Sequence, residues 1–84
     1  MSLTAPRRVD ERQDELAELD RSLIRMIRRR AELVGAIEAE RRAAGLPRTE
    51  LTREIRMLQE YQSGLGRPGV RLALLLLELA RQRS

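Results

Sequence analysis

Three arginines and one glutamate interrupt the apolar stripes of this 84-residue chain. Arg30 and Arg41 fall on the apolar face of the first long helical pattern. Glu54 falls on the apolar stripe of the next pattern, with Arg53 beside it. Charges directed at a helical core cost free energy unless a partner neutralises them. The pattern therefore predicts a pocket in which three cations and one acid receive a small, highly anionic ligand.

A plainer explanation of the same charges also fits the sequence. Arg30 ends the run Arg28–Arg30, and a run of like charges is usually a solvated face. A long arginine side chain on a helical seam can also extend its guanidinium group into water. Glu54 can form a structural ion pair, and Glu50 can pair with Arg53 on the surface. Spacing alone leaves both interpretations open.

All 17 basic residues of the chain are arginines. Lysine, histidine and cysteine are absent. These absences exclude Schiff-base chemistry, thiol chemistry, disulfides and imidazole-based catalysis. They also remove the usual nitrogen and sulfur ligands of metals, so we expect no metal and no cofactor. Guanidinium groups bind carboxylates through two parallel hydrogen bonds, which suits an anionic ligand.

The charge balance and the apolar segments limit the partners. The net charge of +4 comes from arginines interspersed with 13 acids, which argues against a nucleic-acid-binding face. Tyr61 is the only aromatic residue, so platforms for stacked bases are missing. The most apolar run, Val70 to Ala80, is too short to span a bilayer. No secretory signal pattern is found. We therefore expect a cytoplasmic protein with neither nucleic-acid nor membrane partners.

The first expected helix is long. Residues 1–9 lack periodicity and are predicted to be a flexible tail before Asp10, which has the sequence context of an N-cap. From Glu11 to about Ala44, apolar residues recur at helical spacing, and Gly45 is typical of a helix end. This helix would contain about 34 residues and be about 50 Å long.

Two shorter helices are expected to follow. A second helix capped by Thr49 or Thr52 ends near Ser63, and the glycine-rich stretch 64–69 is predicted to be a loop. The third helix is predicted to begin at about Pro68 or Gly69 and to continue to Arg81. It is apolar almost all round, so it must be buried on several sides.

The uncovered apolar surface predicts an oligomer. The rest of the chain is too short to cover the stripe of the first helix. We therefore expect an all-α fold of three helices, one long and two short, in which residues 10–84 form a single domain of an intertwined homodimer. From periodicity alone, a long coiled-coil hairpin that binds no ligand remains an alternative.

The helical spacing brings the charged residues onto two faces. Arg30 and Arg41 are eleven residues apart, close to three turns, so both project to one side about 16 Å apart along the axis. The second helix has its own polar face at positions i, i+3, i+4 and i+7: Glu50, Arg53, Glu54 and Met57. If the second helix folds back on the first, the two faces meet.

Several short motifs follow one another along the chain in a fixed order: Leu19-Asp20, Arg29-Arg30-Ala31-Glu32-Leu33, Ile37, Arg41, Gly45, Arg53-Glu54, Glu60-Tyr61 and Leu74 to Leu79. This order resembles the all-helical (AroQ-class) chorismate mutases, and most closely their short intracellular subclass that DAHP synthase activates. The resemblance covers about residues 12–83. It needs no gap between Asp20 and Tyr61.

The resemblance implies an enzyme that converts chorismate to prephenate by an intramolecular Claisen rearrangement. The family consists of domain-swapped dimers of three-helix chains with two active sites. The reaction needs neither a covalent intermediate nor a proton transfer. The protein holds the dianionic substrate in a compact pose and places cations where charge develops on the ether oxygen. A chain without histidine, cysteine or lysine can perform this chemistry.

The resemblance also implies roles for individual residues. Arg30 clamps a substrate carboxylate. Arg41, a lysine in many members, contacts a carboxylate and the breaking ether bond. Glu54 accepts a hydrogen bond from the ring hydroxyl, and Arg53 helps to order the site. Glu50 stands where many members have an aspartate near that hydroxyl.

The chain departs from the family pattern near both ends. Gln13 stands where the family usually has an arginine that reaches into the partner's site, and the adjacent Arg12 points about 100° away. Loss of such a charge-assisted contact costs on the order of 1.5–3 kcal/mol. Ala80 and Ser84 stand roughly where many members have a serine and a glutamine, and Arg81 belongs to a shortened tail. Gln13, Arg12, Arg81 and Ser84 remain candidates for substrate contacts.

These departures leave other functions open. An enzyme of the same fold could act on 4-amino-4-deoxychorismate or isochorismate, as a mutase or a pyruvate lyase, and Gln13 and Glu50 leave room for such a substrate. A non-catalytic helical dimer could instead dock to another shikimate-pathway enzyme. Weak activity of the chain alone, with DAHP synthase as a possible activating partner, is the leading expectation.

Overall fold

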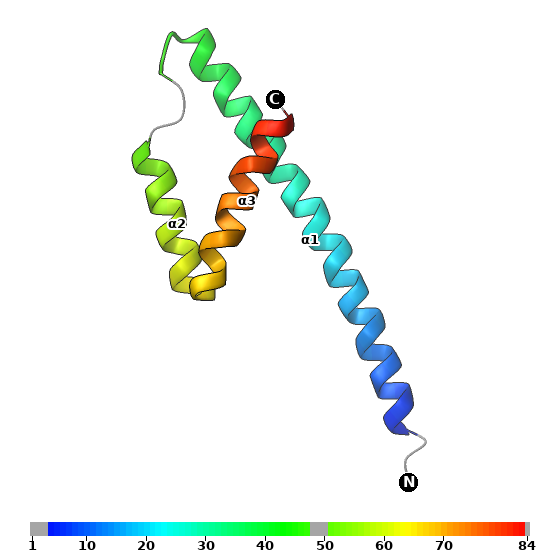
Figure 1. Ribbon diagram of the computed structural model, residues 1–84. Helices are drawn as coiled ribbons and strands as arrows, with labels where there is room; N and C mark the ends of the chain where they lie inside the picture. Colours follow the sequence, from blue (N-terminus) through cyan, green and yellow to red (C-terminus); the bar gives the residue numbers. More distant parts are fainter. Residues whose placement is uncertain (1–3, 48–50, 84) are drawn as a thin grey trace.

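The computed structural model describes residues 4–47 and 51–83. These ranges contain three helices, α1 (Thr4–Ala43), α2 (Leu51–Leu65) and α3 (Arg67–Arg83), and no strand. The predicted all-α fold with one long and two short helices is therefore confirmed (Figure 1).

The start of α1 differs from the prediction. The helix begins at Thr4, so residues 4–9 are helical and the expected N-cap at Asp10 is wrong. Residues 1–3 lie outside the described residues, and the predicted flexibility of residues 1–9 stays a prediction. Pro6 is compatible with the earlier start, because a proline in the first turn of a helix sacrifices no hydrogen bond and has its φ already set to a helical value. Asp10 is an exposed residue inside the helix.

The end of α1 follows the sequence prediction. Gly45 has a φ of 72°, in the left-handed region that favours glycine. The amide of Leu46 donates to the carbonyl of Arg41 at 2.8 Å, and the amide of Gly45 donates to that of Arg42 at 3.1 Å. These two bonds form a Schellman motif, which satisfies carbonyl groups that the last helical turn leaves unpaired.

The connection between α2 and α3 is shorter than predicted. The stretch 64–69 was expected to be a loop, but only Gly66 lies outside a helix there. Gly66 has a φ of 78°, which reverses the chain direction within one residue. Pro68 then falls in the first turn of α3, where it is compatible with the helix. The two helices are therefore joined by a tight corner.

The corner holds α2 and α3 so close together that a β-carbon does not fit at Gly69. A β-carbon at Gly69 would collide with the backbone carbonyl group of Tyr61. We predict that Gly69→Ala lowers the free energy of unfolding by about 1–3 kcal/mol, because backbone at a helix contact cannot yield to the methyl group. Gly64→Ala is the matched control, since a β-carbon there meets nothing within 4 Å. Urea unfolding of both variants measures the difference, and equal stability would contradict this packing.

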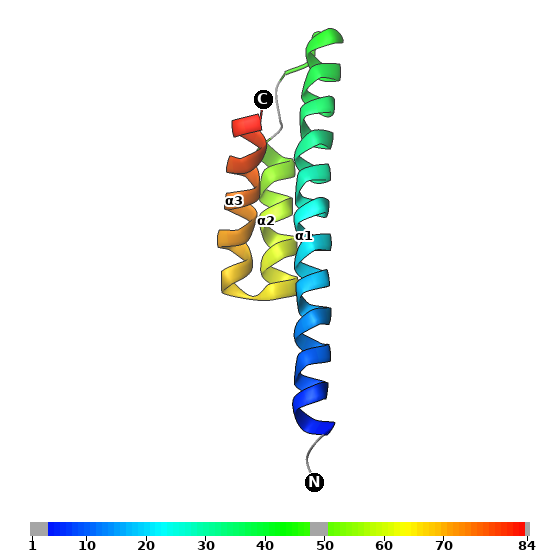
Figure 2. The same ribbon diagram turned by 90° about the vertical axis from the view of Figure 1, so that its right-hand side faces the viewer.

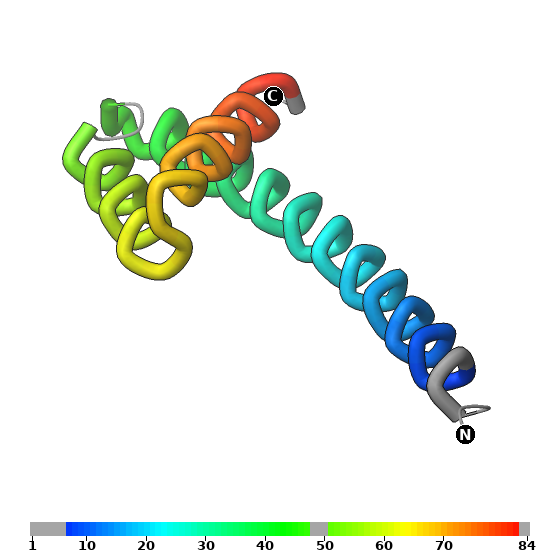
Figure 3. Tube along the Cα trace, turned by 60° about the horizontal axis from the view of Figure 1, so that its bottom comes forward, coloured from blue at the N-terminus to red at the C-terminus, as the bar shows by residue number. Residues whose placement is uncertain are grey.

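The three helices form an elongated molecule rather than a compact bundle. α2 packs against α3, and α3 packs against α1. Figures 2 and 3 show the N-terminal half of α1 projecting beyond the other two helices. The chain extends over 67 × 24 × 16 Å, with a radius of gyration of 18.2 Å. A compact domain of this length would have a radius of gyration of about 12 Å.

The core of a single chain is small. Among the described residues, the buried hydrophobic side chains are Ala31, Ala73, Leu76 and Ala80. Large apolar side chains stay exposed on α1, as Leu19 (61%) shows, and on α3, as Leu75 (57%) shows. The expectation that the third helix is buried on several sides is therefore not met within one chain. Within the described ranges, no helix combines the length and the apolar character needed to cross a bilayer.

Candidate active site

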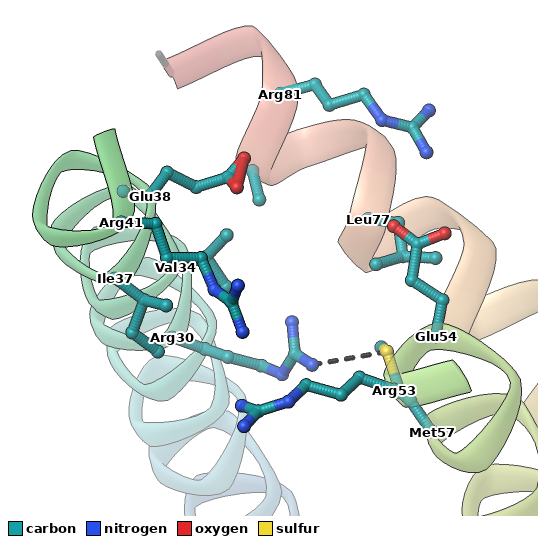
Figure 4. Close-up of a pocket in the computed structure, with 12 residues that line it drawn as sticks. Arg30, Val34, Ile37, Glu38, Arg41, Arg53, Glu54, Met57, Leu77 and Arg81 are labelled. Carbon is teal, nitrogen blue, oxygen red and sulfur yellow. Dashed lines mark hydrogen bonds between the residues drawn. The ribbon is translucent and has the colours of Figure 1, made fainter. Parts of the chain in front are cut away.

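A cavity of about 520 Å³ lies between the C-terminal part of α1, the start of α2 and the end of α3 (Figure 4). This volume lies in the range typical of small-molecule sites. All three helices contribute to its wall: Arg30, Val34, Gly35, Ile37, Glu38 and Arg41 from α1, Arg53, Glu54 and Met57 from α2, and Leu77, Ala80 and Arg81 from α3. The structure therefore brings together the four charged residues from which the sequence predicted a pocket.

α1 supplies two arginines to one side of the cavity. Arg30 and Arg41 are both half-buried, and Val34 and Ile37 lie between them on the same face. A terminal nitrogen of Arg30 donates to the sulfur of Met57 at 3.2 Å. A terminal nitrogen of Arg41 donates to the carbonyl of Pro47, also at 3.2 Å. The bond of Arg30 is partly buried and the bond of Arg41 is exposed to solvent.

The first turns of α2 supply an arginine and a glutamate. Glu54 is half-buried and Arg53 is exposed, although both line the cavity. In Figure 4, Arg53 extends from α2 back toward α1 beneath Arg30, while the carboxylate of Glu54 lies beside Leu77. Arg30, Arg41 and Arg53 therefore lie on one side of the cavity, and Glu54, a hydrogen-bond acceptor, lies on the other. This asymmetry suits a ligand with anionic groups at one side and a hydroxyl or amine at the other.

α1 and α3 add a second acid and a fourth cation. Glu38 reaches from α1 toward α3, and Arg81 comes from the last turns of α3 (Figure 4). The lining thus contains four arginines and two glutamates, a formal net charge of +2. That charge matches a dianion. Arg81 was a predicted site residue, and it lies in the wall of the cavity.

Other predicted site residues do not line this cavity in the single chain. Arg12 and Gln13 are exposed on the projecting half of α1. Gln13 is about 25 Å along the helix axis from Arg30, at 1.5 Å per residue. Glu50 and Ser84 lie outside the described residues, so their predicted roles stay predictions.

Sequence reasoning missed Glu38 as a lining residue. Its spacing contained the signal, because residue 38 lies eight positions after Arg30 and three before Arg41, on the same helical face. Met57 was placed on the correct face of α2, but its contact with Arg30 was not foreseen.

Known proteins are similar in sequence to this protein over most of its chain. The intracellular chorismate mutase of Mycolicibacterium smegmatis is 39% identical over 75 residues, which are 89% of this chain and 72% of that relative. The intracellular chorismate mutases of Mycobacterium bovis and Mycobacterium tuberculosis are also 39% identical over 75 residues, 89% of this chain and 70% of theirs. No protein-family model matches the chain.

The fold and the cavity define an all-helical protein with an arginine-lined pocket for a small anion. Identity of this extent, over most of both chains, then places the protein more narrowly: it belongs to the family of intracellular chorismate mutases, in their all-helical AroQ class. The resemblance inferred from the sequence motifs is thereby confirmed. Activation by DAHP synthase is untested and remains a prediction.

Proposed function

We propose that this protein is a chorismate mutase that converts chorismate to prephenate. The observation that carries the proposal is the cavity in which Arg30, Arg41 and Arg53 surround one side and Glu54 stands on the other. Membership of the intracellular chorismate mutase family supports the same reaction. The names of the relatives also support an intracellular location for this enzyme.

In the proposed reaction, no side chain has to act as a nucleophile, an acid or a base. The ether carbon–oxygen bond of chorismate breaks while a carbon–carbon bond forms within the same molecule, so no group is transferred to the protein. The transition state is compact, and negative charge develops on the ether oxygen. Catalysis therefore depends on holding the reactive conformer and on fixed cations near that oxygen. A cavity lined by arginines supplies both.

The four central residues have distinct proposed roles. Arg30 binds one substrate carboxylate through its guanidinium group. Arg41 binds a carboxylate and stabilises the charge on the ether oxygen. Glu54 accepts a hydrogen bond from the ring hydroxyl, and Arg53 supports the anionic side of the pocket.

We also propose that the chain works as an intertwined homodimer. The support is the apolar surface that one chain leaves exposed, including Leu16 (57%), Leu19 (61%) and Leu23 (50%) on the projecting half of α1. A second copy that covers this stripe would also bring its Arg12 or Gln13 toward the pocket of the first. The proposed dimer would therefore complete each active site as well as each core.

The dimer proposal predicts a gain of activity from Gln13→Arg. A cation at this position would restore a charge-assisted bond to a substrate carboxylate, and we expect kcat/KM to rise about tenfold or more. Steady-state kinetics measures the effect, and sedimentation of the wild-type protein should give twice the mass of one chain. Gln62→Arg, at an exposed position of α2, is the control for added charge. A monomeric wild type, or equal gains in both variants, would contradict the proposal.

DAHP synthase remains the proposed activating partner. The support is the position of the last turns of α3, which contribute Ala80 and Arg81 to the wall of the cavity. A protein that docks beside this end of α3 would therefore be able to change the shape and charge of the pocket. With this partner absent, we expect the isolated chain to turn over chorismate only weakly.

The test of the proposed function compares three substrates with one purified protein. Chorismate, isochorismate and 4-amino-4-deoxychorismate should be supplied at equal concentrations, and products should be separated by chromatography. We expect prephenate from chorismate to dominate. Preferred conversion of either of the other substrates would keep the fold and the pocket but overturn the proposed reaction.

A further inference from the structure

The hydrogen bond from Arg30 to Met57 joins two helices across the pocket. α2 packs on α3, and α3 packs on α1, so the 3.2 Å contact between the Arg30 guanidinium and the Met57 sulfur bridges the opposite walls of the cavity (Figure 4). The contact is partly buried, which limits competition from water. It fixes the direction of an arginine that has no ion pair among the described residues.

A thioether is an unusual but suitable partner for a substrate-binding cation. Its sulfur is a weak, neutral acceptor, whereas a guanidinium group has five N–H donors. Met57 can therefore orient Arg30 without neutralising its charge. A carboxylate in the same place would form a strong charge-assisted bond and compete with the substrate. The methionine contact is weak enough for a substrate carboxylate to take over Arg30.

A second cavity offers the Arg30 side chain an alternative position. It lies next to the first, shares Arg30, Arg53 and Met57 with it, and is otherwise lined by Arg56, Glu60 and Tyr61. Among the described residues, Glu60 is the only carboxylate in its lining. A released Arg30 would be able to turn into this second cavity and pair with Glu60. Such a pair would remove a cation from the substrate pocket.

We propose that Met57 is a positioning residue that holds Arg30 in the substrate pocket and away from Glu60. Met57 acts on the substrate only through Arg30. The predicted effect on turnover rests on the proposed function, but the contact between Arg30 and Met57 does not.

The kinetic test uses Met57→Leu, which preserves volume and apolar character but removes the acceptor. We expect KM for chorismate to rise about fivefold with little change in kcat, because Arg30 binds the substrate carboxylate in both the ground state and the transition state. Adding Glu60→Gln to this variant should restore KM, since the competing carboxylate is then gone. Met26→Leu, at an exposed position of α1, is the control. An unchanged KM in Met57→Leu, or no restoration by Glu60→Gln, would overturn the proposal.

A spectroscopic test works without turnover and with Met57 in place. The chain has three methionines, so methyl-labelled methionine gives a simple carbon–proton spectrum. Arg30→Lys should shift the Met57 methyl signal more than that of Met26, which lies one helical turn from residue 30 in α1 and responds only as a helical neighbour. If the wild type lacks mutase activity but this shift occurs, the proposed function fails while the positioning contact stands. A Met57 signal that does not respond to Arg30→Lys would overturn the contact itself.

Discussion

Replacing Arg30 with alanine should lower kcat/KM for chorismate by about 10²–10³-fold, because it removes a fixed cation from a partly buried anion site. Arg30 is half-buried, spans the cavity and is oriented by Met57 before substrate binds. Water that fills the vacated space cannot supply a bidentate, charged contact to a carboxylate. Steady-state measurement of chorismate consumption gives the size of the loss.

Arg28→Ala is the matched control for this prediction. Arg28 belongs to the same arginine run but is exposed and does not line the cavity. Both variants should keep the helical circular dichroism of the wild type, because neither residue is part of the buried core. Turnover by Arg30→Ala within threefold of the wild type, or an equal loss in Arg28→Ala, would refute the role assigned to Arg30.

Replacing Arg41 with alanine should act mainly on kcat. Its proposed contact with the ether oxygen strengthens as that atom gains negative charge, so the contact stabilises the transition state more than bound chorismate. We expect kcat to fall about 10²–10³-fold with a smaller change in KM. Single-turnover and steady-state rates at saturating chorismate separate the two effects.

Two further variants, Arg41→Lys and Arg42→Ala, are the controls for the Arg41 prediction. A lysine keeps a cation near the ether oxygen and should retain much more activity than alanine, although it loses the planar fork of the guanidinium group. Arg42 is the next residue along α1, is exposed and does not line the cavity, so Arg42→Ala should leave kcat unchanged. A loss in Arg41→Ala that appears only in KM would contradict a contact specific to the transition state.

Periodicity predicted which charged residues share a helical face, because these residues lie on regular helices, but spacing alone left open whether the two faces form a pocket. Arg30 and Arg41 share a face of α1 whatever the partner helices do, and Arg53 and Glu54 share the first turns of α2. Local rules also predicted the end of α1, where Gly45 adopts a left-handed conformation. Helix boundaries next to a proline or a glycine were harder to predict. Pro6 is compatible with an earlier start of α1, and Gly66 alone makes a corner that was predicted as a longer loop.

Side-chain contacts between different helices could not be predicted from the sequence. The bond from Arg30 to Met57 depends on how α3 spaces α1 from α2, and the pattern of neither helix contains that distance. Glu38 lies on the correct face of α1, but it does not interrupt an apolar stripe, so the sequence pattern did not mark it as a pocket residue. The proposed role of Gln13 depends on a second chain. Its position on the projecting half of α1 is consistent with such a role.

The most direct test of this account is the conversion of chorismate to prephenate by the purified wild-type chain, measured with and without DAHP synthase. We expect the chain alone to form prephenate faster than the uncatalysed rearrangement, with no added metal or cofactor, and at a higher rate when DAHP synthase is present. A folded, helical protein that forms no prephenate under either condition would contradict the proposed chorismate mutase activity.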